Sequence, residues 1–327
     1  YQGLHWIQNL SRKMSEPVKI SNYMFSTEAS IGVAVFPKDS SDADELLRFA
    51  DMAMYQMKNQ GKNSYCFYDE TMNEKIKRKN EIIESLRDES LFDELFLQYQ
   101  PIFFADGKKV RGVEALIRWN SKKLGFVSPA EFIPMAEETG RINEIGKWVM
   151  NEACKTLAQL TLGMKHPYIM AINVSAIQLK EATFFSEVYD IVKENRISAE
   201  QLELEITETA FMGRLEETIA ILEELKKSGV SIALDDFGTG YSSLSYLHGL
   251  PIDTLKIDRS LVADVLKNKK AQAMLYGIIE LSRKIGLQAV AEGIETIEQA
   301  EIIQKTGCNY CQGYLFKKPL SKGELVE

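Results

Sequence analysis

The chain has 327 residues, of which 45% are hydrophobic and 26% charged, enough for a large domain with a sizeable core and a smaller second unit. Its formal net charge of −8 argues against binding of long nucleic acid, which usually needs a basic surface. No stretch approaches the roughly 18 uninterrupted apolar residues of a membrane span, and the first residues lack the pattern of a signal peptide. We therefore expect a cytoplasmic protein with no membrane segment in this chain, and the sequence leaves open a membrane or sensor region upstream of Tyr1.

The first 70 residues are expected to form a small α/β unit. A β-branched run at 30–36 predicts a strand, and apolar residues at helical spacing predict a helix at 42–59. A further strand is expected at 64–68. Residues 71–88 are dominated by Lys, Glu and Asn with sparsely spaced isoleucines, which predicts an exposed linker helix.

From residue 89 to residue 327, short apolar runs alternate with amphipathic stretches. The runs lie at 96–104, 110–119, 169–174, 202–207, 231–234, 254–257, 288–291 and 310–316. The helical stretches include 184–194, 215–228, 271–285 and 296–306. Repeated strand–helix units over about 230 residues predict an α/β fold, a TIM-type (β/α)8 barrel. The dipeptide Asp106-Gly107 between the first two runs favours a tight hairpin, so the first strand is predicted to be antiparallel to the second.

Polar residues recur at the carboxyl ends of these strands, which share one face of such a barrel. They are Glu114, Asn173, Glu205, Asp235, Asp236, Lys256, Glu292 and Gln312. A single acidic residue at a strand end is usually an ordinary loop contact, but several carboxylates in one mouth repel each other and resist ionising together. Divalent cations with oxygen ligands would resolve that conflict, as in the two-metal sites of phosphate-ester enzymes. A lysine among them adds a donor near a bound water or a transition-state oxygen.

Cys308 and Cys311 form a Cys-x-x-Cys motif that permits a zinc or redox interpretation. A structural zinc site would need two further Cys or His ligands nearby, and none follow in the sequence. The motif also runs into the apolar stretch 310–316 and does not open a helix, as a thioredoxin-like motif should. We expect reduced thiols without a metal or redox role.

From about Leu86 to the end, the chain resembles the EAL family of cyclic di-GMP phosphodiesterases. The motif that names the family stands here as Glu114-Ala115-Leu116, followed by Ile117-Arg118-Trp119. The other matching segments, in order, are Tyr99-Gln100-Pro101-Ile102, Glu131-Phe132-Ile133-Pro134, Asn173-Val174-Ser175, Glu205-Ile206-Thr207-Glu208, Asp235 to Leu244, Lys256-Ile257-Asp258, Ala291-Glu292-Gly293-Ile294-Glu295 and Gln312-Gly313-Tyr314. The three-letter motif alone would mean little, but this many segments in one order are highly specific.

The resemblance implies hydrolysis of cyclic di-GMP to the linear dinucleotide 5'-pGpG with two Mg²⁺ or Mn²⁺ ions. The implied metal ligands are Glu114, Asn173, Glu205, Asp235, Asp236 and Glu292. Lys256 would orient the attacking water, and Glu208 would act by holding the loop after Asp236; the implied catalytic residues are therefore Glu114, Lys256, Asp236 and Glu208.

The remaining implied roles concern the substrate and the support of the site. Arg118 would contact a substrate phosphate, while Gln100 and Gln312 would help to line the substrate and metal cleft. Glu295 would support a metal ligand from behind. The resemblance also implies a homodimer formed through the barrel.

Residues 1–70 resemble the rear part of a GGDEF (diguanylate cyclase) domain. The matching segments are Ser30-Ile31-Gly32-Val33-Ala34 and Ala50-Asp51-Met52-Ala53-Met54-Tyr55. The loop that names that family should precede this segment, so we do not expect the fragment to make cyclic di-GMP.

Two alternatives stay open beside the phosphodiesterase interpretation. One is a catalytically silent receptor that binds cyclic di-GMP without cleaving it; such proteins typically lose metal ligands, which this sequence keeps. The other is an unrelated Mg²⁺-dependent barrel enzyme with the same carboxylate mouth. That enzyme would not explain the segment from Asp236 to Leu244 or Arg118.

Overall fold

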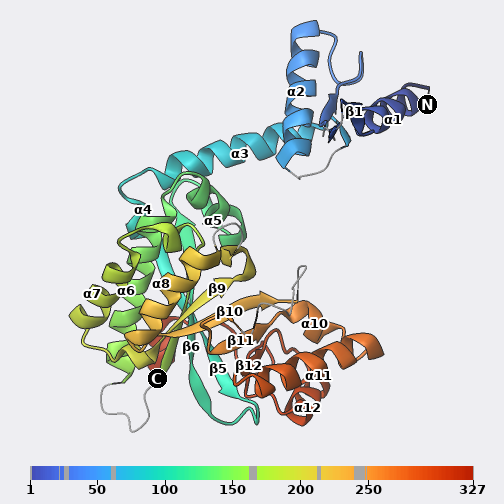
Figure 1. Cartoon of the computed structure of the whole chain (residues 1–327). Helices are drawn as coiled ribbons and strands as arrows, with labels where there is room; N and C mark the ends of the chain where they lie inside the picture. Colours follow the sequence, from blue (N-terminus) through green and yellow to red (C-terminus); the bar gives the residue numbers. More distant parts are fainter. Residues whose placement is uncertain are drawn as a thin grey trace. The chain divides into compact units, whose positions relative to one another are not determined.

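A computed structural model describes residues 2–21, 23–25, 29–59, 64–161, 168–211, 215–238, 247 and 249–326. The chain divides into two compact units, Tyr1–Glu84 and Ser85–Glu327, whose elements are labelled in Figure 1. In the part of the chain that the structure describes, none of the helices combines the length and the apolar character needed to cross a bilayer.

The first unit is a small α/β arrangement around helix α2 (Ala43–Asn59). Its other elements are α1 (Gln2–Met14), the antiparallel pair β1 (Val18–Ile20) and β2 (Tyr23–Phe25), the parallel pair β3 (Ile31–Val33) and β4 (Tyr65–Phe67), and α3 (Glu70–Leu86), which runs across the division. The rings of Phe49 and Tyr68 stack at 4.0 Å in a small core. Strand β3 packs so closely on α2 that a Cβ at Gly32 would lie 1.8 Å from the carbonyl oxygen of Ala50.

The second unit contains a closed eight-stranded barrel, which confirms the predicted fold class. Its strands are β5 (Leu95–Phe104), β6 (Val110–Ser121), β8 (Ile169–Asn173), β9 (Leu202–Thr207), β10 (Ser231–Phe237), β11 (Thr254–Ile257), β12 (Gln288–Ala291) and β13 (Tyr310–Cys311). They follow the order β5-β13-β12-β11-β10-β9-β8-β6, and pairing of β5 with β6 closes the barrel. Strand β5 is antiparallel to both neighbours, as its Asp-Gly hairpin predicted, and the other neighbours in the ring are parallel. A short strand, β7 (Gly125–Val127), pairs with the end of β6.

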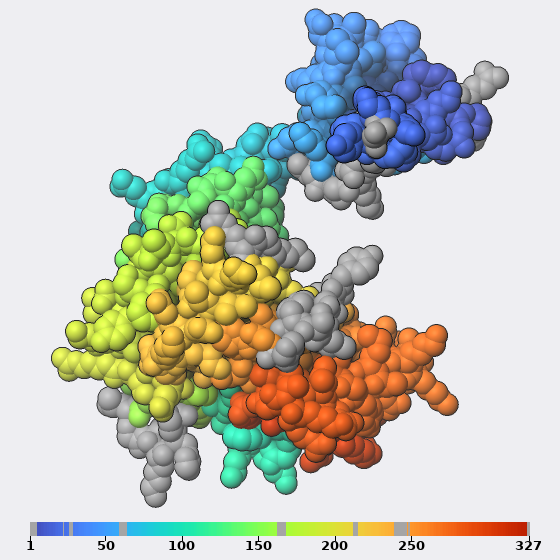
Figure 2. Space-filling model, in the orientation of Figure 1, coloured from blue at the N-terminus to red at the C-terminus, as the bar shows by residue number. Residues whose placement is uncertain are grey.

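Helices cover the outside of the barrel (Figure 1). They are α4 (Leu91–Glu94), α5 (Pro129–Glu138), α6 (Ile142–Leu160), α7 (Phe184–Glu194), α8 (Leu215–Lys227), α10 (Arg259–Ala263), α11 (Lys269–Lys284), α12 (Ile297–Thr306) and α13 (Lys322–Val326), with 3₁₀ turns at η1 (Gln178–Lys180), η2 (Ala199–Gln201) and η3 (Glu208–Phe211). Helix α7 buries Phe184, Val188 and Ile191, which recur at the spacing of one helical face. On the face drawn in Figure 2, the surface of this unit combines residues from the middle of the chain with residues from its last third.

Two strands differ from the predicted runs by three residues or more, and both differences lie at the mouth of the barrel. The fifth run was predicted to end at Leu234, but β10 continues through the two aspartates to Phe237. The eighth run was predicted to reach Phe316, but β13 ends at Cys311. The chain then turns, with the Phe316 N–H donating to the Gly313 carbonyl at 3.1 Å.

An apolar layer fills the barrel below the mouth. Ile102 on β5, Ala171 on β8 and Val290 on β12 form a buried cluster, and these strands alternate around the barrel. Successive side chains on a strand point to opposite faces, so the residue two positions nearer the mouth faces inward as well. On these three strands that residue is Gln100, Asn173 and Glu292.

Candidate active site

Strand alternation gathers the predicted site residues into two rings at the mouth of the barrel. Four residues form an inner ring. Glu114, Glu205 and Lys256 lie on β6, β9 and β11, and Gln312 directly follows β13. Gln100, Asn173, Asp235 and Glu292 form an outer ring on β5, β8, β10 and immediately after β12. Each ring takes one residue from every second strand, as layers in barrels of this type do. The structure therefore brings together all eight residues.

Lys256 lies at the centre of the acidic residues. Its Nζ lies 2.7 Å from Glu205, 2.7 Å from Glu292, 3.2 Å from Asp235 and 3.7 Å from Glu114, measured to a carboxylate oxygen in each case. The residue is 1% exposed. Burial alone would lower the pKa of Lys256, but the surrounding carboxylates outweigh it and raise that pKa well above its usual value. The lysine is therefore a charged ammonium.

One ammonium does not neutralise four carboxyl groups, and the pKa values of Glu114, Glu205 and Glu292 diverge as a result. Burial raises the pKa of Glu205 and raises that of Glu292 to about 8, with the neighbouring carboxylates adding to both effects. Burial also opposes ionisation of Glu114, but Lys256 and hydrogen bonds from the side-chain amides of Gln312 and Asn173, both 2.8 Å, lower its pKa. Glu114 is therefore the more readily ionised of these three glutamates, and the mouth holds more carboxyl groups than positive charges.

The chemistry of the ring residues fits a hard divalent cation. Their donors are carboxylate and amide oxygens, the ligands that Mg²⁺ and Mn²⁺ prefer. Buried Oε1 atoms of Glu205 and Gln312 accept no hydrogen bond from the described residues. Among those residues, no group of three or more acidic, His or Cys side chains surrounds a single metal position, because the carboxylates converge on the Lys256 ammonium.

A bulge brings the two consecutive aspartates to the mouth together. In a regular strand Asp235 and Asp236 would point to opposite faces. The pairing of β10 with β11 shifts between Leu234 and Phe237, and Asp236 adopts a left-handed φ of 56°. Such a backbone costs about 1–3 kcal/mol for a non-glycine residue and clusters at functional sites. The pKa of Asp236 is raised by burial and then by the charge of Asp235.

Two cavities meet at Asp236. The polar cavity, of about 310 Å³, is lined by Gln100, Glu114, Asp235, Asp236, Lys256, Asp258, Arg259, Glu292, Gly293, Glu295, Gln312, Gly313 and Tyr314. The apolar cavity, of about 510 Å³, lies between β6, the end of β8, α5 and α6, and its walls include Leu116, Ile133, Ile145 and Val149. Sequence reasoning assigned no role to Asp258, Arg259 or Tyr314. Asp258 and Tyr314 stand in segments already matched to the family, two residues after Lys256 and Gln312 respectively. That closeness in sequence to two predicted site residues was the signal that could have identified them.

Arg118 lies in the wall of the apolar cavity, which Asp236 also lines. Its Nε donates to the side-chain oxygen of Gln98 at 2.9 Å, and its Nη1 donates to the Ile117 carbonyl at 2.9 Å. Burial lowers the pKa of this guanidinium, and arginine side chains stay charged in proteins. Arg118 is thus a half-buried cation, held in place by hydrogen bonds, beside an apolar wall.

Glu208 and Glu295 lie apart from the two rings. Glu208 begins η3 directly after β9, while most of the loop that it was expected to hold, residues 239–246, lies outside the described residues. Glu295 is exposed at the edge of the polar cavity. Its backbone N–H donates to the Gln299 side chain at 2.9 Å, which ties the loop after Glu292 to α12. The roles implied for both residues stay predictions.

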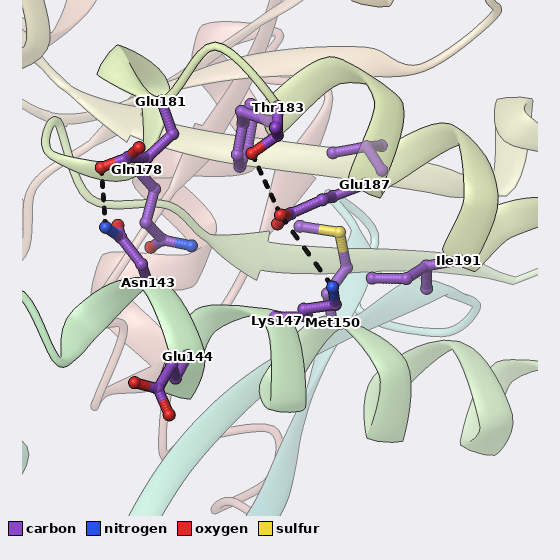
Figure 3. Close-up of a pocket in the computed structure, with 11 residues that line it drawn as sticks. Asn143, Glu144, Lys147, Met150, Gln178, Glu181, Thr183, Glu187 and Ile191 are labelled. Atoms are coloured by element: carbon purple, nitrogen blue, oxygen red, sulfur yellow. Dashed lines mark hydrogen bonds and ion pairs between the residues drawn. The ribbon is translucent and has the colours of Figure 1, made fainter.

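A further cavity, of about 250 Å³, lies on the outer helical layer between α6 and α7 (Figure 3). Asn143 donates to Glu181 at 2.8 Å across one end, and Lys147 pairs with Glu187 at 3.9 Å across the other. None of the predicted site residues lines this cavity. The chemistry-bearing residues are therefore concentrated at the barrel mouth.

The chain matches two known domain families and several known proteins. The EAL domain family matches residues 83–319, and the diguanylate cyclase, GGDEF domain family matches residues 2–64. The bifunctional diguanylate cyclase/cyclic di-GMP phosphodiesterase MucR of Pseudomonas aeruginosa is 38% identical over 98% of this chain and 47% of its own length. The cyclic di-GMP phosphodiesterase NbdA of the same species is 38% identical over 98% of this chain and 41% of its own length. The chain thus spans less than half the length of these relatives.

Solved structures with the same barrel include enzymes bound to cyclic di-GMP. The PaMucR phosphodiesterase in complex with c-di-GMP is 37% identical, with a TM-score of 0.71, and the match covers 75% of this chain and 99% of that one. The EAL enzyme Bd1971 with cAMP and cyclic-di-GMP bound is 33% identical, with a TM-score of 0.72, over 88% of this chain and 77% of that one. The chain belongs to the EAL family, and its EAL domain is preceded by a partial GGDEF domain.

Proposed function

We propose that the chain is a phosphodiesterase that uses two Mg²⁺ or Mn²⁺ ions to hydrolyse cyclic di-GMP to linear 5'-pGpG. The observation that carries the proposal is the excess of carboxyl groups over cations at the mouth. Four acidic side chains share the single ammonium of Lys256, and burial leaves Glu205 and Glu292 with raised pKa values. Bound dications would supply the missing positive charge where a phosphate must enter.

The residues that would hold the ions are Glu114, Asn173, Glu205, Asp235, Asp236 and Glu292. When bound, the ions would lower the pKa of a water ligand and stabilise charge on the phosphoryl oxygens. Asn173 and Gln312 already orient Glu114 through 2.8 Å hydrogen bonds, so this carboxylate is held ready in one position. Positioned ligands of this kind reduce the reorganisation needed during the reaction.

Lys256 would act as a fixed, positively charged hydrogen-bond donor near the reacting phosphate. Its pKa is raised well above the usual value, so the amine stays protonated at neutral pH. A buried ammonium can donate hydrogen bonds to a water or to a developing oxyanion, and it does so more strongly than in bulk water. In the proposed site Lys256 therefore orients water and offsets negative charge, and does not serve as a base.

The two cavities match the two chemical parts of a cyclic dinucleotide. Its phosphodiesters are anionic, whereas its guanine bases are flat and largely apolar on their faces. The polar cavity contains the carboxylates and Lys256, and Arg118 stands in the wall of the neighbouring apolar cavity. Because Asp236 lines both cavities, a ligand that bridges them would place a phosphate beside the acidic rings. Arg118 would bind a phosphate, and the apolar wall would receive a base.

The test is turnover by the purified chain with Mn²⁺ or Mg²⁺, followed as conversion of cyclic di-GMP to 5'-pGpG by chromatography. Excess EDTA should stop the reaction, and Glu114→Ala should abolish it. A suitable control is Glu187→Ala, which removes a carboxylate from the α6–α7 cavity and should leave turnover unchanged. Ca²⁺ alone should bind without supporting turnover, because its larger, looser coordination does not suit a two-metal reaction.

Binding without cleavage would overturn the proposal. If the chain with saturating Mn²⁺ binds cyclic di-GMP tightly and releases no linear product, the chain is a receptor. Undiminished turnover in EDTA or in the Glu114→Ala variant would instead show that the reaction does not use this carboxylate mouth.

A further inference from the structure

A second polar cluster lies at the end of the barrel opposite the mouth and takes no part in the chemistry proposed above. Glu203 is 1% exposed and accepts two hydrogen bonds from the guanidinium of Arg111, both 2.7 Å. It also accepts one from the Thr254 hydroxyl at 2.8 Å. The Arg111 guanidinium carbon lies 4.4 Å from the centre of the Tyr310 ring. We call Arg111, Glu203, Thr254 and Tyr310 the polar layer.

A second bulge turns Arg111 into the barrel. On β6, Gly112 is opposite Ile102 of β5, and Val110 is opposite Phe103. Arg111 is therefore the extra residue, with no partner in the register. A bulge of this kind re-aims the side chain at which it occurs, so the arginine reaches Glu203 inside the barrel.

Each member of the polar layer stands beneath one member of the inner ring. Glu203, Thr254 and Tyr310 lie two positions before Glu205, Lys256 and Gln312 on their respective strands, so both residues of each pair face the same side. Arg111 lies three positions before Glu114, and the additional residue is the bulge. The polar layer and the inner ring therefore use the same four strands, β6, β9, β11 and β13.

The strands β9 and β11 are linked twice across the barrel interior. Glu203 bonds Thr254 at 2.8 Å, and one layer higher Glu205 contacts Lys256 at 2.7 Å. Strand β10 lies between them and contributes Ala233, which is in register with both Glu205 and Thr254. Because alanine is small, it leaves space for side chains from β9 and β11 to meet over it. The lower link fixes where these strands stand relative to each other.

Packing alone does not require such a layer. Barrel interiors are mostly filled by branched aliphatic residues, and a buried ion pair is often no more stabilising than apolar residues of similar volume. We infer that Arg111, Glu203 and Thr254 are positioning residues, which hold β9 against β11 so that Glu205 and Lys256 keep their contact in the active site. This inference rests on the proposed phosphodiesterase function.

The first test compares two buried threonines. Thr254→Val removes the hydroxyl that bonds Glu203. The matched control is Thr156→Val on α6, which removes an equally buried hydroxyl that accepts from Tyr99 at 2.8 Å outside the barrel interior. Both variants should melt at a lower temperature. Only Thr254→Val should lower kcat, on the order of tenfold with KM nearly unchanged, and weaken Mn²⁺ binding measured calorimetrically without substrate. Thr254→Ser, which keeps the hydroxyl, should restore both properties.

The second test removes the ion pair. Arg111→Met and Glu203→Gln alone should destabilise the barrel, because each leaves a buried group without its partner. The double variant should regain much of the melting temperature, yet its kcat and its Mn²⁺ affinity should remain low. Parental kcat and Mn²⁺ affinity in both Thr254→Val and the double variant would overturn the inference. If the parent chain shows no turnover while Thr254→Val still weakens Mn²⁺ binding, the phosphodiesterase proposal fails and the positioning role stands.

Discussion

In the absence of divalent metal, the barrel should lose stability as the pH rises through the neutral range. The pKa of Glu292 is about 8 in the folded protein, against a usual value of 4.5. Between these two values the folded state binds one proton more than the unfolded state, so stability falls as the pH rises. Glu205, whose pKa is also raised, acts in the same direction. Glu114 has a lowered pKa and Lys256 a raised one, so their contributions change only below or above this window.

The expected size follows from the proton difference. Each additional proton bound by the folded state changes the free energy of unfolding by about 1.4 kcal/mol for every pH unit. Glu292 alone should therefore remove about 3 kcal/mol between about pH 5.5 and 7.5. Domains are typically stable by only about 5–15 kcal/mol, so the loss should be readily measurable.

The assay is urea unfolding in EDTA at several pH values, followed by tryptophan fluorescence. A Trp6→Phe background removes the tryptophan of the first unit and leaves Trp119 and Trp148, which report on the barrel. Glu292→Gln should reduce the slope by about 1.4 kcal/mol per pH unit, whereas Glu187→Gln should not. An unchanged slope in Glu292→Gln, or stability that increases with pH in the parent, would refute the reasoning. Saturating Mn²⁺ should stabilise the protein most at the high end of the range, because it binds the ionised carboxylates.

Three further outcomes are expected. Arg118→Ala should raise KM for cyclic di-GMP about 10- to 100-fold with a smaller change in kcat, in steady-state assays, because its guanidinium is proposed to bind a phosphate remote from the attacking water. Lys256→Met should abolish turnover and lower the melting temperature in EDTA, because the Lys256 ammonium is the cation that pairs with the four carboxylates. Mn²⁺ should restore much of the lost melting temperature. Gly293→Ala should lower the free energy of unfolding by about 1–3 kcal/mol and reduce activity, since φ is 66° and the new Cβ would lie 2.3 Å from that of Arg259. The control is Gly286→Ala, where φ is 82° and no atom lies within 4 Å of the new Cβ. It should lower the free energy of unfolding in urea by about 1 kcal/mol and retain activity.

The composition of the barrel mouth could be predicted from sequence because it follows from two simple rules. Parallel strands end on the same face of a barrel, and alternate residues of a strand face the same side. Asn173, Lys256 and Glu292 each lie within or just after a short apolar run, so these two rules are enough to place their side chains together. The antiparallel first strand followed from one dipeptide, Asp106-Gly107.

The bulges could not be predicted because they belong to pairs of strands and not to one segment. Asp236 reaches the mouth only through the shift in register between β10 and β11. Arg111 stands close after Lys108 and Lys109 in the hairpin, so from the sequence alone it would be taken for one more exposed basic residue. Its side chain is only 9% exposed, because one position of β6 has no partner on β5 and the side chain turns inward there. In both cases the direction of the side chain depends on the pairing with a neighbouring strand, which the sequence of the strand itself does not contain.

Strand β9 shows why burial itself was harder to predict than position. Its sequence, Leu202-Glu203-Leu204-Glu205, alternates in a way that usually means leucines in a core and glutamates in water. In the barrel all four residues are buried, because the closed interior contains the glutamates and the leucines on the opposite face of the strand lie under the outer layer. Each glutamate pairs there with a cation from another strand, Glu203 with Arg111 and Glu205 with Lys256. Arg111 donates two hydrogen bonds to the carboxylate of Glu203, whereas Lys256 is shared among several carboxylates. That difference separates a structural layer of the barrel from a layer suited to bind metal ions.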